Sequence, residues 1–450
     1  MQKNDCFDLT ITGITNEGNG VGRHEGMAVF VPSSAPGDLA RVRAVKVLSR
    51  HAYGRIETLL CSSPARIDPG CAVFGRCGGC ALRHIDYREE LAVKQGWVEE
   101  NLRRIGGLSI PVEPIIGSDD PDRYRNKAIY PITREEGHVH IGFYARRSHR
   151  LIGQTDCLMH PTIFSVLAGA AASWLEQQHV SIYDEQAHAG LARALFLRAG
   201  EATGEVMACL VVNGNSLPDE QRFVAALRHV CPDLRSVVLN SNTSRTNVML
   251  GPHCRTLWGS DTITDRLCGL VFELSPLSFY QVNRRGAERL YGVAADYAAL
   301  TEHETLLDLY CGAGTIGLTM ADRAGRLFGI DVVPEAIGNA IDNAARNGVS
   351  NARFLCADAA EATKQLATDG VVHPVVILLD PPRKGCSAAL LDEVVQMNPR
   401  RVVMVSCDSA TAARDIKILS AAGYTATRAR PIDLFPRTTH VETVIALDRG

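Results

Sequence analysis

The stretch Glu304–Leu318 reads E-T-L-L-D-L-Y-C-G-A-G-T-I-G-L and decides how the second half of the chain folds. Its apolar run Thr305–Tyr310 ends at Gly312 and Gly314, and helical spacing resumes after them. We therefore predict a strand, a tight glycine turn and a helix. Glycines let the backbone approach a ligand closely, and the free N–H groups and dipole at the start of a helix favour an anionic group. The stretch predicts a nucleotide-binding corner.

The identity of the nucleotide depends on the acids around this corner. The glycines fit G-x-G-x-x-G, a pattern shared with dinucleotide sites: Gly312, Gly314 and Gly317. Asp331 follows about 20 residues later, where such sites carry a ribose-binding acid. Asp308 adds a carboxylate that can hold a ligand's ammonium group. Together these residues resemble motif I of methyltransferases that use S-adenosylmethionine (SAM), which we favour over a nicotinamide cofactor or a glycine turn without a ligand.

The composition is that of a globular protein, and 450 residues suffice for two or three domains. There is no apolar run long enough to span a bilayer and no signal-peptide pattern at Met1–Asp8, so we expect a cytoplasmic protein without membrane contact. The 14 cysteines are mostly scattered, which argues against a disulfide framework. A formal net charge of -3 gives no overall sign of nucleic-acid binding.

Two segments are nevertheless locally basic. Arg41–Arg55 contains five bases and no acid: Arg41, Arg43, Lys46, Arg50 and Arg55. Arg123–Arg150 contains seven bases against Glu135 and Glu136: Arg123, Arg125, Lys127, Arg134, Arg146, Arg147 and Arg150. Such patches can bind RNA phosphate, and ordinary solvated faces are the alternative.

Residues 1–60 show short alternating runs broken by Gly18-Asn19-Gly20 and Pro36-Gly37-Asp38: Phe7–Ile14, Met27–Val31, Leu39–Val47 and Tyr53–Leu60. This spacing predicts a five-stranded barrel of the OB type, a fold that often binds single-stranded nucleic acid. The stretch G-I-T-N-E-G-N-G-V-G-R-H-E-G-M-A-V-F-V-P, which begins at Gly13, resembles a TRAM domain, an RNA-binding module of RNA-modifying enzymes. RNA binding here rests on that resemblance, because barrels also serve as spacers.

Three cysteines lie close together among glycines in G-C-A-V-F-G-R-C-G-G-C: Cys71, Cys77 and Cys80. Glycine flanks allow several thiolates to converge on one centre, and Cys157 is the best candidate for a fourth ligand. Four thiolates fit either a structural zinc ion or an iron–sulfur cluster, and the ligands alone leave both open.

We divide the chain into residues 1–60, the barrel, residues 61–275, a cysteine-bearing segment with a central mixed α/β domain, and residues 276–450. Within the second part, Ile85–Gly106 has helical spacing and predicts a surface helix. The third part consists of βα repeats whose apolar runs predict a Rossmann-like parallel sheet covered on both faces: Thr305–Tyr310, Arg326–Ile330, Ala352–Cys356, Pro374–Leu379 and Arg401–Ser406.

Each of the later strands ends in a side chain able to do chemistry at the carboxyl edge, where α/β sheets bind ligands: Asp331, Asp358, Asp380 and Cys407. Glu442 joins this rim if the last strand, Glu442–Leu447, runs antiparallel. A buried structural thiol is the ordinary interpretation of a single cysteine, but the shared rim favours a nucleophile at Cys407.

The segment Asp380-Pro381-Pro382-Arg383 indicates the type of acceptor. Enzymes that methylate exocyclic amines carry an aromatic residue where this chain has Arg383, so a cysteine with a carboxylate suggests carbon methylation instead. Carbon 5 of uracil is a weak nucleophile. Addition of a thiolate at carbon 6 converts the ring to an enolate that can attack a methyl group, and a base then removes the carbon 5 proton.

Five motifs together resemble the RNA uracil-5-methyltransferase family: S-F-Y-Q-V-N, D-L-Y-C-G-A-G-T-I-G-L, D-P-P-R-K-G, V-S-C-D-S-A-T-A-A-R-D and H-V-E-T-V. The resemblance implies Cys407 as the nucleophile and Glu442 as the base. It also implies SAM contacts from Gln281, Tyr310, Asp331 and Asp380, with Thr315 and Asp358 as further contacts. Cys71, Cys77, Cys80 and Cys157 would ligate a [4Fe-4S] cluster.

One position departs from the family pattern, because Ser409 stands where proline usually follows S-C-D. Members with both a TRAM domain and a cluster resemble enzymes of the large-subunit (23S) ribosomal RNA, so we expect that substrate and no obligate protein partner. Methylation of transfer RNA is the nearest alternative, and an RNA-binding assembly factor without catalysis is an alternative of another class.

Overall fold

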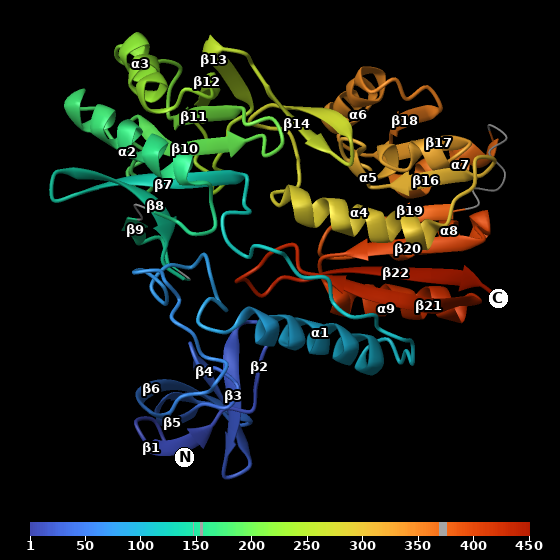
Figure 1. The fold of residues 1–450 in the computed structure, drawn as a ribbon, viewed down its shortest axis with the longest axis horizontal. Helices are drawn as coiled ribbons and strands as arrows, with labels where there is room; N and C mark the ends of the chain where they lie inside the picture. Colours follow the sequence, from blue (N-terminus) through green and yellow to red (C-terminus); the bar gives the residue numbers. More distant parts are fainter. Residues whose placement is uncertain (147, 154–155, 369–375) are drawn as a thin grey trace.

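A computed structural model of the protein describes residues 1–146, 148–153, 156–368 and 376–450. Three sheets build the molecule (Figure 1): a barrel at the N-terminus, a central mixed sheet, and a C-terminal sheet with helices on both faces. The predicted α/β class and its Rossmann-like C-terminal sheet are confirmed. The predicted domain boundaries remain predictions.

The N-terminal barrel has six strands in the order β1-β5-β6-β4-β3-β2, so the predicted count of five was wrong. Its strands are β1 (Cys6–Thr10), β2 (Gly13–Ile14), β3 (Asn19–His24), β4 (Met27–Pro32), β5 (Leu39–Val47) and β6 (His51–Cys61). The predicted break at Gly18-Asn19-Gly20 is confirmed at Gly18, which has φ of 78° in the turn between β2 and β3, whereas Asn19 and Gly20 already belong to β3. A side chain at Gly20 would collide with Ser34, so this glycine serves close packing inside a strand and does not form a turn.

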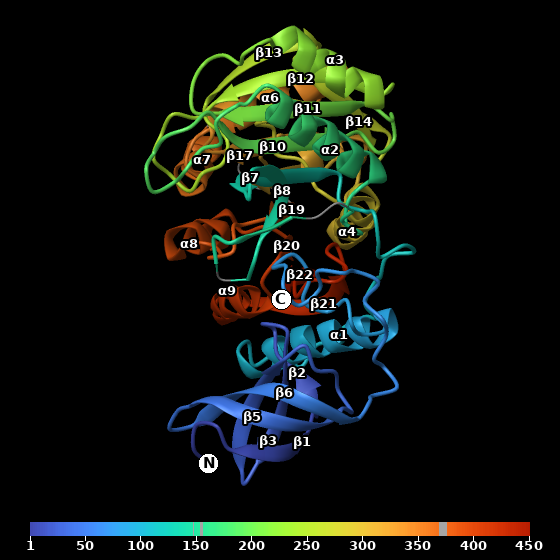
Figure 2. The same cartoon turned by 90° about the vertical axis from the view of Figure 1, so that its left-hand side faces the viewer.

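Helix α1 (Tyr87–Arg104) follows the cysteine-bearing segment and lies between the barrel and the C-terminal sheet (Figure 2). The predicted helix is confirmed, but its description as a surface helix was incomplete. Val98 and Leu102 pack into the core beneath the C-terminal sheet. The same buried stripe carries Glu90 and Lys94, both fully buried, which hydrophobic periodicity alone does not predict.

The central sheet has seven strands in the order β13-β12-β11-β10-β7-β8-β9. They are β7 (Lys127–Glu135), β8 (His138–Tyr144), β9 (Leu151–Gly153), β10 (Ala192–Ala199), β11 (Val206–Val212), β12 (Leu234–Ser241) and β13 (His253–Gly259). Helices α2 (Thr162–Gln177) and α3 (Glu220–Val230) bury Trp174 and Phe223 against this sheet. The hairpin β14 (Ile263–Leu267) and β15 (Leu270–Leu274) leads to the C-terminal domain.

The C-terminal sheet has the order β18-β17-β16-β19-β20-β22-β21. Its strands are β16 (Thr305–Leu309), β17 (Arg326–Asp331), β18 (Ala352–Cys356), β19 (Val376–Leu379), β20 (Arg401–Ser406), β21 (Tyr424–Ile432) and β22 (Glu442–Arg449). The first five are parallel, and β22 runs antiparallel to β20, as its place on the rim required. Strand β21 was not predicted, and the first two residues of the predicted run from 374 to 379 lie outside the described residues.

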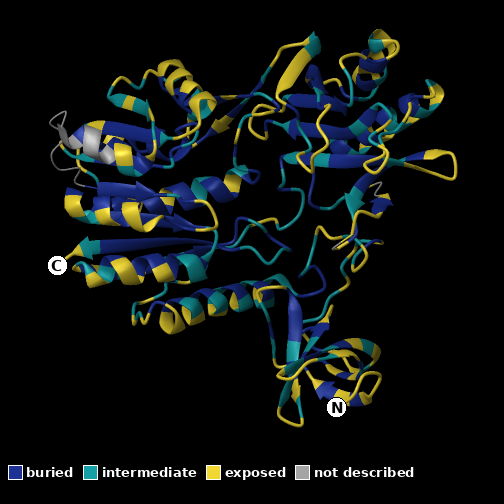
Figure 3. Ribbon diagram, turned by 180° about the vertical axis from the view of Figure 1, so that it is seen from behind, coloured by how far each residue is buried: buried dark blue, intermediate teal, exposed yellow. Residues whose placement is uncertain are grey.

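The helices around this sheet are α4 (Arg284–Ala298), α5 (Thr315–Leu318), the 3₁₀ turn η1 (Ala321–Arg323), α6 (Pro334–Arg346), α7 (Ala359–Thr368), α8 (Ala388–Met397) and α9 (Ser409–Ala421). Alternate strand residues pack on opposite faces: Leu306 and Leu378 lie in the core with α4, whereas Leu307 and Ile377 lie in the core with α8 and α9. Burial is nearly continuous along β16, β17, β19 and β20 (Figure 3), whereas β18 at the edge of the sheet is only partly buried. The near-continuous apolar runs are thus explained by a sheet covered on both sides.

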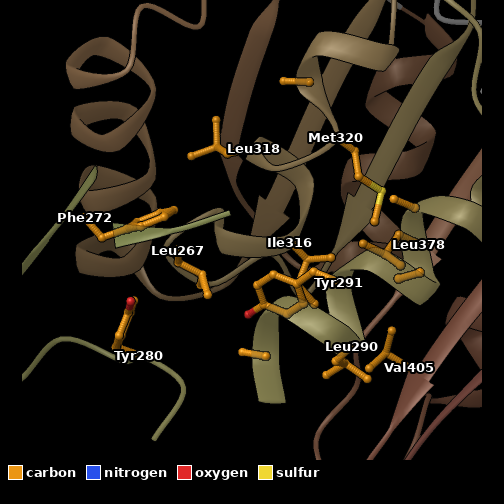
Figure 4. Close-up of a cluster of buried hydrophobic side chains, with 14 of the residues drawn as sticks. Leu267, Phe272, Tyr280, Leu290, Tyr291, Ile316, Leu318, Met320, Leu378 and Val405 are labelled. Atoms are coloured by element: carbon orange, nitrogen blue, oxygen red, sulfur yellow. The ribbon is translucent and has the colours of Figure 1, made fainter. Parts of the chain in front are cut away.

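One hydrophobic cluster lies directly beneath the nucleotide corner (Figure 4). Tyr291 and Leu290 of α4 pack with Ile316 of α5 and with Val405 at the end of β20. These four side chains also line the large cavity described next. The core therefore fixes the floor of the site.

Candidate active site

The glycine corner has the backbone that the sequence predicts. Gly312 and Gly314 have φ of 55° and 77°, in the left-handed region that favours glycine, and α5 begins at Thr315. Asp331 at the end of β17 braces the turn, because its Oδ2 accepts from the Gly312 N–H at 3.0 Å and its Oδ1 from the Val333 N–H at 2.9 Å. A ribose hydroxyl approaching Asp331 would meet a carboxylate already held in place.

Asp308 lies beneath the glycine corner, and only one of its two carboxylate oxygens has a hydrogen-bond partner among the described residues. Its Oδ2 accepts from the Gly317 N–H at 3.0 Å, whereas the buried Oδ1 has no hydrogen-bond partner among the described residues. Burial, together with the neighbouring Asp380, raises the pKa of Asp308 to about 8. An ammonium group of a ligand would supply both the missing partner and the missing charge, so the site fits SAM.

A cavity of about 1220 Å³ opens at the carboxyl edge of the sheet. Seven of the eight predicted catalytic and SAM-contacting residues line it: Gln281, Tyr310, Thr315, Asp331, Asp380, Cys407 and Glu442. Asp358 is the exception, since it is exposed and accepts from the Ala360 N–H at the start of α7, outside the cavity lining. Its role as a SAM contact remains a prediction.

Strand pairing brings Cys407 and Glu442 to opposite positions. The register pairs Ser406 of β20 with Thr443 of β22, so the next position on each chain places Cys407 across from Glu442. Burial raises the pKa of Glu442 to about 8; Asp380 acts in the same direction and Arg383 opposes it. Burial and the Glu442 carboxylate raise the pKa of the Cys407 thiol, and Arg383 again acts in the opposite direction. A base and a thiol thus share one cationic neighbour.

Arg383 and His440 belong to this site although we did not predict them as functional residues. The Arg383 Nη2 lies 3.1 Å from both ring nitrogens of His440, so the guanidinium lies against the imidazole. Burial and the cation lower the His440 pKa to about 4, which keeps the ring neutral. The sequence did contain indications that both residues belong to the site, because Arg383 follows D-P-P and His440 stands two residues before Glu442.

Two further cations face the cavity. Arg125 and Lys127 both line it, on either side of Asn126, whose side chain donates to the Gln281 carbonyl at 3.0 Å. Lys127 lies opposite the buried Arg198 in the β7–β10 pairing. Burial, Arg198 and Arg125 lower the Lys127 pKa to about 8. Cations placed side by side in this way favour an anion in the cavity.

The four predicted metal ligands line a second cavity, of about 300 Å³: Cys71, Cys77, Cys80 and Cys157. Within the described ranges, no three His, Cys, Asp or Glu side chains approach one another closely enough to hold a single metal ion. Four thiols remain compatible with either a structural zinc ion or an iron–sulfur cluster. The [4Fe-4S] assignment therefore remains a prediction.

The two cavities share a wall. Arg125, Thr438 and His440 line both of them. Thr438 and His440 belong to the loop 433–441, which joins β21 to β22 and leads directly into Glu442. The cysteine-bearing segment and the catalytic rim are therefore in contact through one loop.

The fold and the site define a methyltransferase that uses SAM. A family model described as tRNA (uracil-5-)-methyltransferase matches residues 261–450, and a TRAM domain model matches residues 2–56. An uncharacterized RNA methyltransferase of Halalkalibacterium halodurans is 39% identical over 100% of this chain and 98% of its own length. One of Clostridium tetani is 38% identical over 99% of this chain and 97% of its own length.

Among solved structures, the tRNA (uracil-54, C5)-methyltransferase of Pyrococcus abyssi, in complex with S-adenosyl-L-homocysteine, matches with a TM-score of 0.79 and 28% identity. The match covers 98% of this chain and 100% of that one. The protein belongs to the RNA (uracil-5-)-methyltransferase family and is a SAM-dependent enzyme, which excludes the non-catalytic assembly factor. None of the helices in the described residues is long and apolar enough to span a membrane.

Proposed function

We propose that this enzyme methylates carbon 5 of a uridine in RNA through a covalent bond between Cys407 and carbon 6, and that Glu442 removes the carbon 5 proton. The observation that carries this proposal is the β20–β22 register, which sets Cys407 opposite Glu442 on the cavity beneath the glycine corner. A thiol and a base on one rim match the two tasks of the reaction.

The proposed steps balance as follows. The Cys407 thiol gives up its proton to water, and its sulfur bonds to carbon 6, which turns the ring into an enolate. Carbon 5 takes the methyl group as the bond between that group and the sulfonium sulfur breaks, so that S-adenosyl-L-homocysteine would leave, and Glu442 removes the carbon 5 proton. The electron pair of that C–H bond re-forms the ring double bond as the bond between carbon 6 and sulfur breaks, which restores the Cys407 thiolate. Arg383 is placed to favour the thiolate, because it opposes the upward pKa shift of Cys407.

The residues around the glycine corner would hold SAM, which supplies an electrophilic methyl group when bound. Asp308 would hold the ammonium group through its unpartnered oxygen, and Asp331 the ribose. Gln281, Tyr310, Thr315 and Asp380 line the same cavity and complete the proposed set, to which the family resemblance adds Asp358 although it does not line the cavity. The raised pKa of Asp380, about 7, reflects its burial and leaves it able to accept a hydrogen bond from a cationic ligand.

We propose that Arg125 and Lys127 hold a phosphate of the RNA strand that delivers the flipped uridine. Both line the cavity, and no hydrogen-bond or ion-pair partner of either cationic group is found among the described residues. Other bases of the same segment are engaged: Arg123 pairs with Asp156 at 2.6 Å, and Arg146 donates to the Glu17 carbonyl. Arg147 lies outside the described residues. A uracil must leave its stack to reach Cys407, which favours an unpaired target.

We propose 23S ribosomal RNA as the substrate, because the TRAM domain and the cysteine set resemble those of the ribosomal RNA enzymes. The second candidate is transfer RNA, which is favoured by the likeness to the Pyrococcus abyssi enzyme over 98% of this chain. That likeness includes nearly the whole chain, so domain composition alone does not separate the two substrates. Mapping 5-methyluridine by mass spectrometry in ribosomal and transfer RNA from a deletion strain decides between them.

We further propose that Cys71, Cys77, Cys80 and Cys157 hold a [4Fe-4S] cluster. The supporting observation is that all four thiols line one small cavity. The cysteine-bearing loop already contacts the end of β8, since Cys77 forms an isolated β-bridge with Ala145, the residue directly after that strand.

The test of the proposed mechanism uses Glu442→Gln with SAM and unmodified RNA. We expect this variant to accumulate a denaturation-resistant protein–RNA complex that contains the transferred methyl group, because the thiolate cannot leave before the proton does. Asp408→Asn is the matched control, since Asp408 stands beside Cys407 but caps α9 through the N–H groups of Ala410 and Thr411. Normal turnover by Glu442→Gln would assign the base to another group on the rim.

A further inference from the structure

A buried ionic network lies behind the catalytic rim. The Lys94 ammonium on α1 is fully buried and makes three contacts: with Glu90 at 2.8 Å, with Asp433 at 2.8 Å and with the Phe435 carbonyl at 3.2 Å. Asp433 and Phe435 both belong to the loop 433–441. One side chain of α1 thus uses all three of its donors, two of them on this loop.

Other members of the network hold the same loop from α1. Glu90 accepts from the Arg437 backbone N–H at 2.7 Å, and Tyr87 donates to the second oxygen of Asp433 at 2.8 Å. The Arg437 side chain reaches back to Glu90 at 3.4 Å. Arg437 has φ of 68°, in the left-handed region, so the loop is fixed in a shape that its backbone alone would not favour.

The loop also contacts the cysteine-bearing segment directly. The Arg437 carbonyl accepts from the N–H groups of Ala81 at 2.9 Å and Leu82 at 3.0 Å, immediately after Cys80. Two further bonds tie the loop to the other domains, since Tyr124 donates to the Pro436 carbonyl and Asn283 to the Leu434 carbonyl. The loop is therefore held from three sides and ends at Glu442.

We propose that Lys94 is a positioning residue of the reaction: with Glu90 and Asp433 it holds the loop 433–441, and thereby sets where His440 and Glu442 stand relative to Cys407. The inference rests on the proposed role of Glu442. Burying two carboxylates and two cations is costly, and replacing such a group by apolar residues often leaves stability unchanged or improves it. Stability alone therefore does not explain why these charges are buried, whereas their role in holding the loop 433–441 does.

The expected defect falls on one step of the reaction. Displacement of a catalytic group by about 1 Å can cost roughly 100-fold in rate. Lys94→Met should therefore slow release of methylated RNA by about 10- to 100-fold and accumulate the methylated covalent complex. Adduct formation at Cys407 and SAM affinity should stay within about twofold, because neither depends on Glu442. The measurements are single-turnover kinetics, gel analysis of the covalent complex and SAM titration.

Two variants guard against a simple folding defect. Asp433→Asn keeps acceptors for Lys94 and Phe435 and should show a weaker form of the same release defect. The double variant Lys94→Met, Asp433→Asn removes one charge of each sign and leaves Glu90 paired with Arg437, so it should regain stability while release stays slow. Arg104→Met is the matched control on α1, since Arg104 forms an exposed ion pair with Glu100 at 2.7 Å and should change nothing.

Hydrogen exchange gives a readout independent of the chemistry. In Lys94→Met, the amides of residues 433–441 should exchange at least about tenfold faster, while those of β20 and β22 stay unchanged. The proposal is overturned if adduct formation and release fall together, or if loop exchange is unaltered. If Glu442→Gln turns over normally, the assignment of the base fails, and the exchange result still decides whether Lys94 positions the loop.

Discussion

The two cavities that meet at Arg125, Thr438 and His440 use cysteine in different surroundings. Two thiols line the active-site cavity, Cys311 in the glycine corner and Cys407, which lies beside an acid and a cation. The smaller cavity contains four thiols, and its described lining includes three arginines but no carboxylate. The Cys407 thiol therefore lies beside a carboxylate, whereas the four thiols of the smaller cavity face one another.

The difference shows in how each thiol could become a thiolate. Burial raises the pKa of Cys77, Cys80 and Cys157, the last to about 11, so these thiols stay protonated at neutral pH unless a metal displaces the proton. Burial also raises the pKa of Cys407, but Arg383 opposes the shift. Arg83 opposes the upward pKa shift of Cys80 in the same way, so what distinguishes Cys407 is the neighbouring Glu442 carboxylate, since the described lining of the four-thiol cavity includes no carboxylate.

The largest expected effect is that of removing the Cys407 thiol. Cys407→Ala should lower methyl transfer by at least about 10³-fold and form no covalent RNA complex, since the enolate cannot arise without the sulfur. Cys356→Ala is the control, because Cys356 is exposed at the end of β18 and does not line the cavity. The measurements are 5-methyluridine by mass spectrometry and denaturing gels. Near-native methyl transfer by Cys407→Ala would show that the reaction does not proceed through a covalent bond to Cys407.

The second effect tests the four-thiol cavity. Protein purified without oxygen should be brown and hold about four irons with sulfide, and Cys157→Ser should lose the iron and at least about tenfold of the activity. Cys254→Ser is a control on an exposed cysteine of the central sheet. Iron and sulfide analysis together with the visible spectrum provide the readout. Stoichiometric zinc without iron would replace the cluster by a structural zinc site.

The sequence predicted most of the difference between the two cysteine sites, because the patterns that indicate them involve residues close together in the chain. Strand ends, glycine turns and cysteine spacing are read from neighbouring residues, and they located the glycine corner and the five parallel strands of the C-terminal sheet, although not their order in it. The position of Glu442 required one further condition, an antiparallel β22, which the structure confirms.

What the sequence did not predict depends on packing between distant segments. Lys94 meets Asp433 across more than 300 residues, and helical spacing identifies α1 without indicating that its buried stripe is charged. Strand β21 was missed because its core-facing residues alternate with Arg428 and Arg430, as in a strand at the edge of the sheet. In the barrel, Gly20 was taken for a turn because close packing against Ser34 leaves no mark in the sequence.

The third prediction uses the pH dependence of the base. The pKa of Glu442 is raised from 4.5 to about 8 by burial, so the folded protein holds this proton more tightly than the unfolded chain does. Its contribution to stability is fully present below about pH 4.5 and is lost as the pH rises toward about 8. Glu442→Gln should therefore melt several degrees above the parent near pH 9, with little difference near pH 5.

The same ionisation sets the activity profile. Release of methylated RNA needs the Glu442 carboxylate, so its rate should rise with pH up to about 8 and then level off. SAM-free protein is used for the melting curves and single turnover for the rates. An equal difference in melting temperature at both pH values would show that Glu442 is already ionised near pH 5.

The smallest effect concerns the basic segment of the barrel, whose residues line neither cavity. In the first basic segment, Arg41 pairs with Asp8 and Arg43 with Glu57, which leaves Lys46 and Arg50 without a partner among the described residues. Exposed pairs are weak, yet each lowers the local positive charge. Lys46→Ala with Arg50→Ala should therefore weaken RNA binding less than about tenfold.

The salt dependence separates phosphate contacts from a general loss of affinity. Each contact with a single strand contributes about 0.7 to the slope of log affinity against log salt, so losing Lys46 and Arg50 should flatten the slope by about 1.4. Arg41→Ala with Arg43→Ala is the matched control and should flatten it less, because Asp8 and Glu57 already compete for these guanidinium groups. Equal slopes for all three proteins would assign the basic segment to a solvated face, and RNA contact would then fall to Arg125 and Lys127 at the cavity.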